Sequence, residues 1–370
     1  MRTVGVEEEL LLVDARTGVP APVAEQVLAA DADADDRIVA EFLAEMIEMR
    51  TRPHTDAGDL AAELCALRAE IGVRAGALGT AAAALSTSPL PATGTVMPVA
   101  RFARIAAEFG VLAREHLTCG RHVHVEVADE DEGAAVLDRT RIWLPTLLAL
   151  TAGSPFRGGE DTGYASFRWH LMARWPISGP PVVVGSGEGY RRWVDDLLGT
   201  GVVLDEGMVY LDARLSSHLP TVEVRVADVC PDVRVTVLLA LLVRALVETA
   251  AGQWHQDRRV RGGRAGVAAA PDTTHLRLAT WRASRHGLTG ELVDPATGSP
   301  APASRVVADL VDHVRPALVD SGDVALVEDA VRRLLGEGGE AQRQREVYRR
   351  SARLSEVVSD AVRRTLVVPV

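Results

Sequence analysis

The chain has 370 residues, of which 47% are hydrophobic, and it carries a formal net charge of −11 at neutral pH. It is long enough to bury a large core, and its acidic balance argues against nucleic acid as the main partner. The longest apolar stretch, Val235 to Val243, falls well short of the ~18 residues that a membrane-spanning helix needs, so we expect no membrane segment.

The sequence contains no lysine, so all 40 basic residues are arginine. This excludes a Walker A loop, a kinase-type lysine and a Schiff-base lysine, and leaves phosphate chemistry to arginine, metal ions and backbone amides. Cys65, Cys119 and Cys230 are scattered and form no CxxC pair, which favours a reducing compartment. Because residues 1–3 lead directly into a predicted strand, we expect no signal peptide and a cytoplasmic location.

Residues 4–13 predict a first strand that carries acid on one face. Side chains alternate along a strand, so Glu7 and Glu9 share a face while Leu10 and Leu12 lie on the other, as does Glu8. A carboxylate that faces a dry core would be very costly. The strand therefore either lines a wet or metal-filled cavity or lies on the surface with solvated glutamates.

The following segments are mostly helical in pattern. Residues 41–49 fit either a helix, with Glu41, Glu45 and Glu48 on one face, or a strand that begins near Met46 and presents Glu48. Helices are predicted over 56–85, 99–115 and 131–150.

Residues 119–127 alternate strictly and predict a second strand, on which His122 and His124 share a face. The two histidines could bind a metal or a phosphate, or could simply be hydrogen-bonded within the sheet. A zinc site that includes Cys119 would need a bulge at Gly120, because Cys119 otherwise faces the opposite side.

The second half of the chain begins with a glycine-rich loop, 153–163, which is either a cover for a site or an ordinary surface loop. In a third strand, 222–229, Glu223 and Arg225 share a face opposite valines.

A long apolar helix is predicted at 233–251, and the last third is helical with a break at 336–339. Strands with interspersed helices but no regular βαβ spacing favour an α+β fold with an antiparallel sheet, in a single domain over residues 1–370.

The acids on these segments are hard oxygen ligands. If they converge, their like charges require cations, and Mg²⁺ or Mn²⁺, often shared with a nucleotide phosphate, is the natural partner. The guanidinium of Arg225 matches phosphate or carboxylate in a bidentate manner, although an ion pair with a neighbouring acid is the alternative. The candidate acids are Glu7, Glu9, Glu41, Glu48 and Glu223.

Several motifs in a fixed order resemble the type 2 glutamate–cysteine ligase-like family, carboxylate–amine ligases distantly related to glutamine synthetase. The resemblance runs essentially from end to end and rests on the blocks at 5–10, 41–51, 119–125, 161–166, 174–181, 220–229 and 342–345. It implies a curved antiparallel sheet that forms an active-site funnel flanked by helices, with ATP at one end, amino-acid substrates at the other, and Mg²⁺ held by carboxylates on the strands.

The resemblance also implies roles for individual residues. The metal ligands are expected to be Glu7, Glu9, Glu41, Glu48, His122 and Glu223. Arg225, Glu48 and Glu223 are expected to be catalytic, with Arg225 at the γ-phosphate, and His124 and Arg174 are further candidates for ATP binding. Tyr164 and Arg168 fall in a block expected to shape the substrate end.

The expected reaction is ATP-dependent amide formation through an acyl phosphate, most simply between L-glutamate and L-cysteine. This chain departs from the usual pattern at 167–171 and 212–216, near the substrate end, so a different acid and amine remain an alternative. A small-molecule phosphotransferase or ATPase on the same fold, or a silent nucleotide-binding protein, are further alternatives. The expected partners are small molecules, and a homodimer is in keeping with the family.

Overall fold

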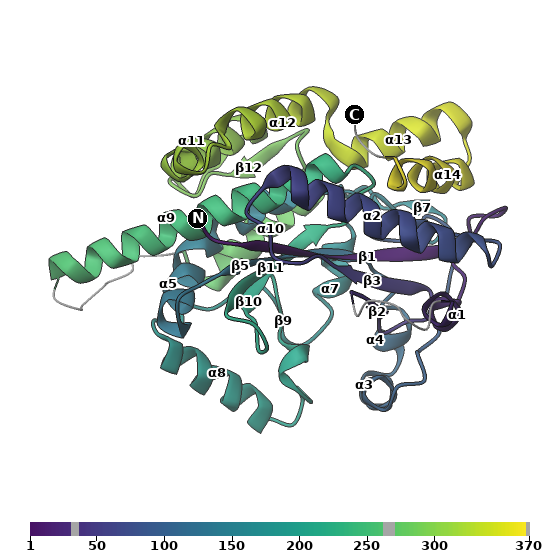
Figure 1. Cartoon of the computed structure of the whole chain (residues 1–370), viewed down its shortest axis with the longest axis horizontal. Coiled ribbons are helices and arrows are strands. Elements are labelled where there is room, and N and C mark those ends of the chain that lie inside the picture. The colour runs from purple at the N-terminus through teal and green to yellow at the C-terminus, as the bar shows by residue number, and fades with distance from the viewer. Residues whose placement is uncertain (31–36, 262–270, 368–370) are drawn as a thin grey trace.

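The computed structural model describes residues 1–30, 37–261 and 271–367 and has an antiparallel sheet at its centre (Figure 1). In this part of the chain the sheet has seven strands in the order β10-β11-β5-β1-β3-β2, with β4 paired to the far end of β1. The strands are β1 Val4–Asp14, β2 Ile38–Ala40, β3 Met46–Arg50, β4 Thr80–Ala83, β5 Gly120–Glu126, β10 Ala213–Leu215 and β11 Thr221–Asp228. Helices flank this sheet, which confirms the predicted α+β class.

One face of the sheet is dry because helices cover it. The covering helices are α2 Ala57–Gly76 and α9 Val233–Arg261, with α11 Ala303–Ser321, α12 Val324–Glu337, α13 Gly339–Ser351 and α14 Leu354–Thr365 stacked around them (Figure 1). By length and composition α9 could cross a membrane, but 83% of its apolar window is buried inside the molecule, as in the core helix of a soluble protein.

Shorter elements approach the opposite face (Figure 1). They are α3 Ala100–Phe109, α4 Val111–Arg114, α7 Arg168–Met172, α8 Gly187–Gly199 and the paired strands β8 Ser178–Gly179 and β9 Tyr210–Leu211. The remaining elements are α1 Ala24–Ala29, α5 Glu130–Thr140, a 3-10 turn Arg141–Trp143, α6 Leu144–Thr151, the hairpin β6 Phe156–Arg157 and β7 Glu160–Asp161, a 3-10 turn Glu206–Met208, α10 Thr273–His286, and the hairpin β12 Glu291–Val293 and β13 Pro300–Pro302.

Glu8 lies on the dry face, as strand alternation predicts, and it is fully buried there. Arg68 of α2 donates two hydrogen bonds to its carboxylate, at 2.8 and 2.9 Å, and the Thr236 hydroxyl of α9 donates a third at 2.7 Å. Burial alone would raise the pKa of Glu8, but Arg68 outweighs it and lowers the pKa. This acid is tolerated in the core because each of its partners is also buried and hydrogen-bonded.

Three predicted helices are interrupted, and the one predicted over 99–115 is divided at Gly110 into α3 and α4. The helix predicted over 56–85 ends at Gly76; after a turn in which Gly79 has φ +71°, residues Thr80–Ala83 pair with β1 instead. Alanine favours helix locally, but strand pairing in the core overrides that preference. The helix predicted over 131–150 is split by a 3-10 turn and restarts with Pro145 in its first turn, where proline is tolerated.

The segment with an ambiguous period, 41–49, resolves as a strand from Met46. The predicted break at 336–339 is confirmed, because α12 ends at Glu337 and α13 begins at Gly339.

Candidate active site

The open face of the sheet gathers charged side chains from five neighbouring strands. Residues that lie directly opposite in paired strands share a face. The register places Glu7 between His122 and Arg50, Glu9 opposite Glu48, and Glu223 between His124 and Arg214. The predicted acids and histidines therefore meet on one surface.

A bulge in β11 lies at Arg225. Between Val224 and Ala227 this strand advances three residues while β5 advances two, so one residue of β11 is extra. The backbone N–H of Arg225 donates to the carbonyl of Asp212, at 2.8 Å, rather than into the β5 ladder. Bulges re-aim side chains, and here the Arg225 guanidinium contacts Glu223 and lies 3.3 Å from Nδ1 of His122.

Glu7, His124 and Glu223 form a first cluster, in which one potential ligand atom from each residue lies within 4.8 Å of the others. Nδ1 of His124 bonds the Thr221 hydroxyl at 3.0 Å, which leaves Nε2 buried and without a hydrogen bond. That nitrogen lies 3.5 Å from Oε1 of Glu7 and 3.9 Å from Oε1 of Glu223. A buried, unbonded nitrogen that faces two carboxylates fits a divalent cation.

The carboxylates of this first cluster are held ionised. Burial alone would raise the pKa of Glu7, but the hydrogen bond with His122 and the proximity of His124 outweigh it and lower the pKa. Burial opposes ionisation of Glu223 as well, and Arg225 and Arg214 together lower its pKa well below the usual range. Nε of Arg214 lies 2.6 Å from Glu223.

Glu9, Glu41 and Glu48 form a second cluster with the same 4.8 Å spacing. Burial and the charge of Glu9 raise the pKa of Glu41 to about 7. Burial and the charges of Glu7 and Glu41 raise the pKa of Glu48 well above its usual value. Three carboxylates this close cannot all ionise without a cation, so the second cluster also fits a metal ion.

A small cavity of about 50 Å³ adjoins both the second cluster and the substrate block. Its lining includes Glu9, Glu41, His122 and Arg225 of the charged face together with Arg168, His116, Trp175 and Tyr210. Such a volume holds a few water molecules or one small polar group. The cavity thus joins the metal-binding face to the segment predicted to shape the substrate end.

Arg168 is a buried cation whose ion pair within the described part of the chain is loose. It is 4% exposed, its Nε has no hydrogen-bond partner, and its other nitrogens reach two backbone carbonyls only at 3.4 Å. The carboxylate that pairs with it, Asp228, is 3.9 Å away. A buried charge with only long hydrogen bonds and a distant carboxylate is costly, so the side chain is well suited to receive an anionic group of a ligand.

Three residues of the charged face and cavity were not among the predicted site residues: His116, Arg50 and Arg214. Trp175 donates to Nδ1 of His116, at 2.9 Å, so Nε2 of His116 carries the proton. Burial and the charge of Arg168 lower the pKa of His116 to about 3, which keeps it a neutral donor on the cavity wall. Arg50, 2.5 Å from Glu48, and Arg214 also belong to the charged face.

Two predicted residues lie apart from this site. Arg174 pairs with Glu115 at 2.8 Å on the surface and does not line the cavity. Tyr164 packs on His170, with ring centroids 4.3 Å apart, and beneath Arg285. The fold does not bring these two residues together with the acid clusters, and their contacts with ATP and substrate stay predictions.

Two alternatives from the sequence also lose support. Among the described residues, the candidate metal clusters do not include Cys119, and the bulge lies in β11 instead of at Gly120. The loop 153–163 is a hairpin, β6–β7, tied to the carbonyls of Ser88 and Pro89 by Gly158 and Gly159, which is typical of an anchored surface loop more than of a movable cover.

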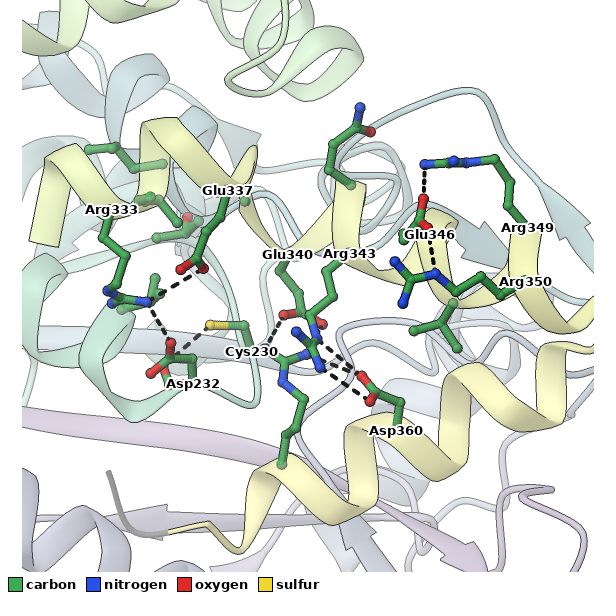
Figure 2. A pocket seen from close by; sticks show the side chains of 18 residues that line it. Cys230, Asp232, Arg333, Glu337, Glu340, Arg343, Glu346, Arg349, Arg350 and Asp360 are labelled. Atoms are coloured by element: carbon green, nitrogen blue, oxygen red, sulfur yellow. Dashed lines mark hydrogen bonds and ion pairs between the residues drawn. The ribbon is translucent and has the colours of Figure 1, made fainter. Parts of the chain in front are cut away.

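A larger pocket of about 440 Å³ lies on the covered side, between α12, α13 and α14. Figure 2 shows that its arginines and acids face one another, including Arg333 with Asp232 and Arg343 with Asp360. The acids of the open sheet face do not line it. Its charges are mutually paired, so the open face is the better candidate for the active site.

Comparisons with known proteins agree with this geometry. The model of the family described as glutamate-cysteine ligase family 2 (GCS2) matches residues 3–364. A Streptomyces coelicolor protein that carries the provisional name glutamate–cysteine ligase 2 is 48% identical, with 99% of each chain covered. A Paenarthrobacter aurescens protein with the provisional name glutamate–cysteine ligase 2-1 is 44% identical, covering 99% of this chain and 95% of the relative.

Solved structures share the fold at low sequence identity. The glutamate–cysteine ligase of Francisella tularensis, solved in complex with AMP, has a TM-score of 0.71 at 16% identity, covering 99% of this chain and 88% of that one. A bifunctional glutathione synthetase from Pasteurella multocida has a TM-score of 0.68 at 15% identity and covers 99% of this chain and 52% of that one. The family, the α+β fold and the class of carbon–nitrogen ligase expected from the sequence are thereby confirmed: the chain belongs to the glutamate–cysteine ligase family 2.

Proposed function

We propose that this protein is an ATP-dependent carboxylate–amine ligase that activates an acid donor as an acyl phosphate and transfers the acyl group to an amine. The observation that carries the proposal is a cavity whose lining includes two acids of the second cluster, Arg225 and the loosely paired Arg168, with the first cluster on the same sheet face. L-Glutamate and L-cysteine, the substrates in the names of the relatives, are the simplest pair, and the AMP complex of the Francisella enzyme supports ATP as the co-substrate.

Glu7, His124 and Glu223 would hold one divalent cation, and Glu9, Glu41 and Glu48 another. When bound, Mg²⁺ or Mn²⁺ would screen the ATP phosphates and stabilise the charge on the transferring phosphoryl group. His122 lies 3.1 Å from Glu7 and 3.9 Å from Glu9, so it spaces the two clusters and orients their carboxylates.

In the first step an oxygen of the donor carboxylate attacks the γ-phosphorus of ATP. The new phosphorus–oxygen bond forms as the bond to the bridging oxygen breaks, and ADP leaves. Because Arg225 stays charged beside Glu223, Glu9 and Glu7, it provides a fixed cation for the γ-phosphoryl oxygens. Arg50, which is half exposed at the outer edge of the acid row, provides a second guanidinium for the phosphate chain.

In the second step the amine lone pair attacks the acyl carbon and inorganic phosphate leaves with the proton that the amine loses. The neutral Nε2–H of His116 can donate to the carbonyl oxygen as negative charge develops on it. Arg168 receives a second anionic group of the donor, which suits a dicarboxylic amino acid such as glutamate. The small size of the cavity limits water, which would otherwise hydrolyse the acyl phosphate.

The cysteines bear on the cellular compartment in which the protein works. Cys65, Cys119 and Cys230 are all free thiols, which suits a reducing compartment such as the cytoplasm. The site is built for small molecules, so we propose no macromolecular substrate.

The test is trapping of the acyl phosphate with hydroxylamine. With ATP, Mg²⁺ and glutamate but no amine, a hydroxamate should accumulate, and cysteine should replace it with a dipeptide. Glu223→Gln and Glu48→Gln should lose both products. A phosphorylated donor that never reacts with hydroxylamine would instead indicate a phosphotransferase, and ATP hydrolysis independent of any acid would indicate an ATPase.

A further inference from the structure

Asp228 ends β11, and the bulge in that strand turns it towards the site. Its register partner is Gly120, which shares a face with His122, while Ala227 is opposite Arg121 on the dry face. Without the extra residue, strand alternation would place Asp228 on the dry face together with Val224. The bulge that re-aims Arg225 therefore also brings the carboxylate of Asp228 to the open face, where Glu223 of the same strand already lies.

The Asp228 carboxylate, which is fully buried, joins the two ends of the segment that leads into α7. Its Oδ2 accepts hydrogen bonds from the backbone of Gly153, at 2.9 Å, and from the hydroxyl of Ser154, at 2.7 Å. Its Oδ1 accepts one from the hydroxyl of Ser166, at 2.9 Å. The Ser154 hydroxyl in turn accepts the backbone N–H of Arg168, at 3.0 Å, so Asp228 fixes the point from which the Arg168 side chain departs.

The guanidinium of Arg168 is held in place by close packing more than by its hydrogen bonds. A Cβ added at Gly120 would lie 2.1 Å from Nη2 of Arg168, so the guanidinium lies directly on the glycine backbone of β5. Its hydrogen bonds are long and Asp228 is 3.9 Å away, so they hold it only loosely. Small shifts in the start of α7 would therefore move the guanidinium.

The same segment is held from the other side by α13. The Gln344 amide donates to the carbonyl of Gly153 at 2.8 Å, and Arg345 donates to the carbonyl of Tyr164 at 2.9 Å. Asp228 is thus the link between this anchored segment and the strand that carries Glu223 and Arg225.

We propose that Asp228 is a positioning residue that fixes Arg168 for recognition of the acid donor, and so sets the donor end relative to the phosphate-binding strand. This rests on the proposed function, in which Arg168 receives an anionic group of the donor. Asp228 touches neither ATP nor the acid clusters, so it acts through Arg168 alone.

Two variants of Asp228 separate the effect of its hydrogen bonds from the effect of its charge. In Asp228→Asn, the amide oxygen can accept from Gly153 and Ser154 while its NH₂ donates to the Ser166 hydroxyl, which can turn to accept. In Asp228→Ala all three bonds are lost. The alanine variant should raise the KM for the acid donor by about 10- to 100-fold, because a displacement near 1 Å has effects of that size, with the KM for ATP unchanged. The asparagine variant should restore most of the loss.

A readout without turnover keeps this proposal separate from the proposed function. Phenylglyoxal modifies accessible guanidinium groups, and peptide mass spectrometry can follow Arg168 in the metal-free protein. Arg168 should react slowly in the wild type and in Asp228→Asn, and faster in Asp228→Ala. If the alanine variant does not fold, Ser166→Ala removes one bond, and Gly120→Ala displaces the guanidinium directly; both should show the same faster reaction.

Equal modification of Arg168 in the wild type and in the variants that remove these bonds would overturn the proposal, whatever the protein catalyses. So would an Asp228→Ala effect on the donor KM that persists in an Arg168→Ala background, because a residue that acts through Arg168 has nothing left to position there. A wild-type enzyme that forms no amide would contradict the proposed function alone, and the modification rates would still decide the role of Asp228.

Discussion

Glu41→Gln should stabilise the metal-free protein while it abolishes function. The carboxyl of Glu41 is partly buried beside Glu9, and this burial together with the charge of Glu9 raises its pKa from 4.5 to about 7. Because the folded pKa lies above the unfolded one, ionisation of this group opposes folding: the wild type loses stability as the pH rises from about 4.5 to 7, and the loss is complete above 7. The difference corresponds to about 3 kcal/mol at most.

The assay is urea unfolding at pH 5 and pH 8, with and without Mg²⁺. Without metal, Glu41→Gln should exceed the wild type by up to about 3 kcal/mol at pH 8 and match it closely at pH 5. With Mg²⁺ at 100 times its Kd the difference at pH 8 should nearly disappear, because a ligand that binds only the folded state adds about 2.7 kcal/mol to the wild type, and the variant, which lacks one of the carboxylates, gains less.

Glu25→Gln, at an exposed glutamate of α1, is the matched control and should change neither quantity. If metal-free Glu41→Gln is less stable than the wild type at pH 8, or if Mg²⁺ stabilises both proteins equally, the assignment of this cluster to a cation is wrong.

Three further outcomes follow from the same geometry. Glu8→Gln, which leaves Arg68 buried without its carboxylate, should destabilise the protein by about 3–5 kcal/mol without changing Mg²⁺ affinity, as measured by urea unfolding and calorimetry. His124→Ala should weaken Mg²⁺ binding at least about tenfold, because its unbonded Nε2 faces Glu7 and Glu223; unchanged affinity in calorimetry would exclude it as a ligand. Arg174→Ala should leave the KM for ATP within about twofold, since an exposed ion pair contributes little; a large increase would return Arg174 to the ATP site.

Strand alternation was enough to place Glu7 and Glu9 on one face of β1 with Glu8 on the other, and to place Glu223 on the face opposite the valines of β11, because the side-chain period of a strand is local. The helix or strand choice for Glu48 was not local: it was decided by pairing with β1, which brings Glu48 opposite Glu9. Alternation says nothing about the order of strands in a sheet. The prediction that the three acidic strands are neighbours rested instead on the family resemblance, which was identified from motifs in a fixed order.

What escaped prediction depends on contacts between distant segments. The extra residue of β11, which re-aims Arg225 and turns Asp228 to the open face, has no signal in the valine-rich alternation of that strand. Arg68 is 60 residues from the Glu8 that it neutralises, and a buried arginine on a helix looks like any other in sequence. His116 becomes a cavity donor only because Trp175 fixes its tautomer.

The most direct measurement of the central claim is the transfer of isotopically labelled oxygen from the donor carboxylate to phosphate. Glutamate labelled in its side-chain carboxylate is incubated with the enzyme, ATP, Mg²⁺ and an amine, and the phosphate released is analysed by mass spectrometry. An acyl-phosphate ligase places one labelled oxygen in each phosphate and forms an equal amount of amide. Unlabelled phosphate, or phosphate release without amide, would contradict the account.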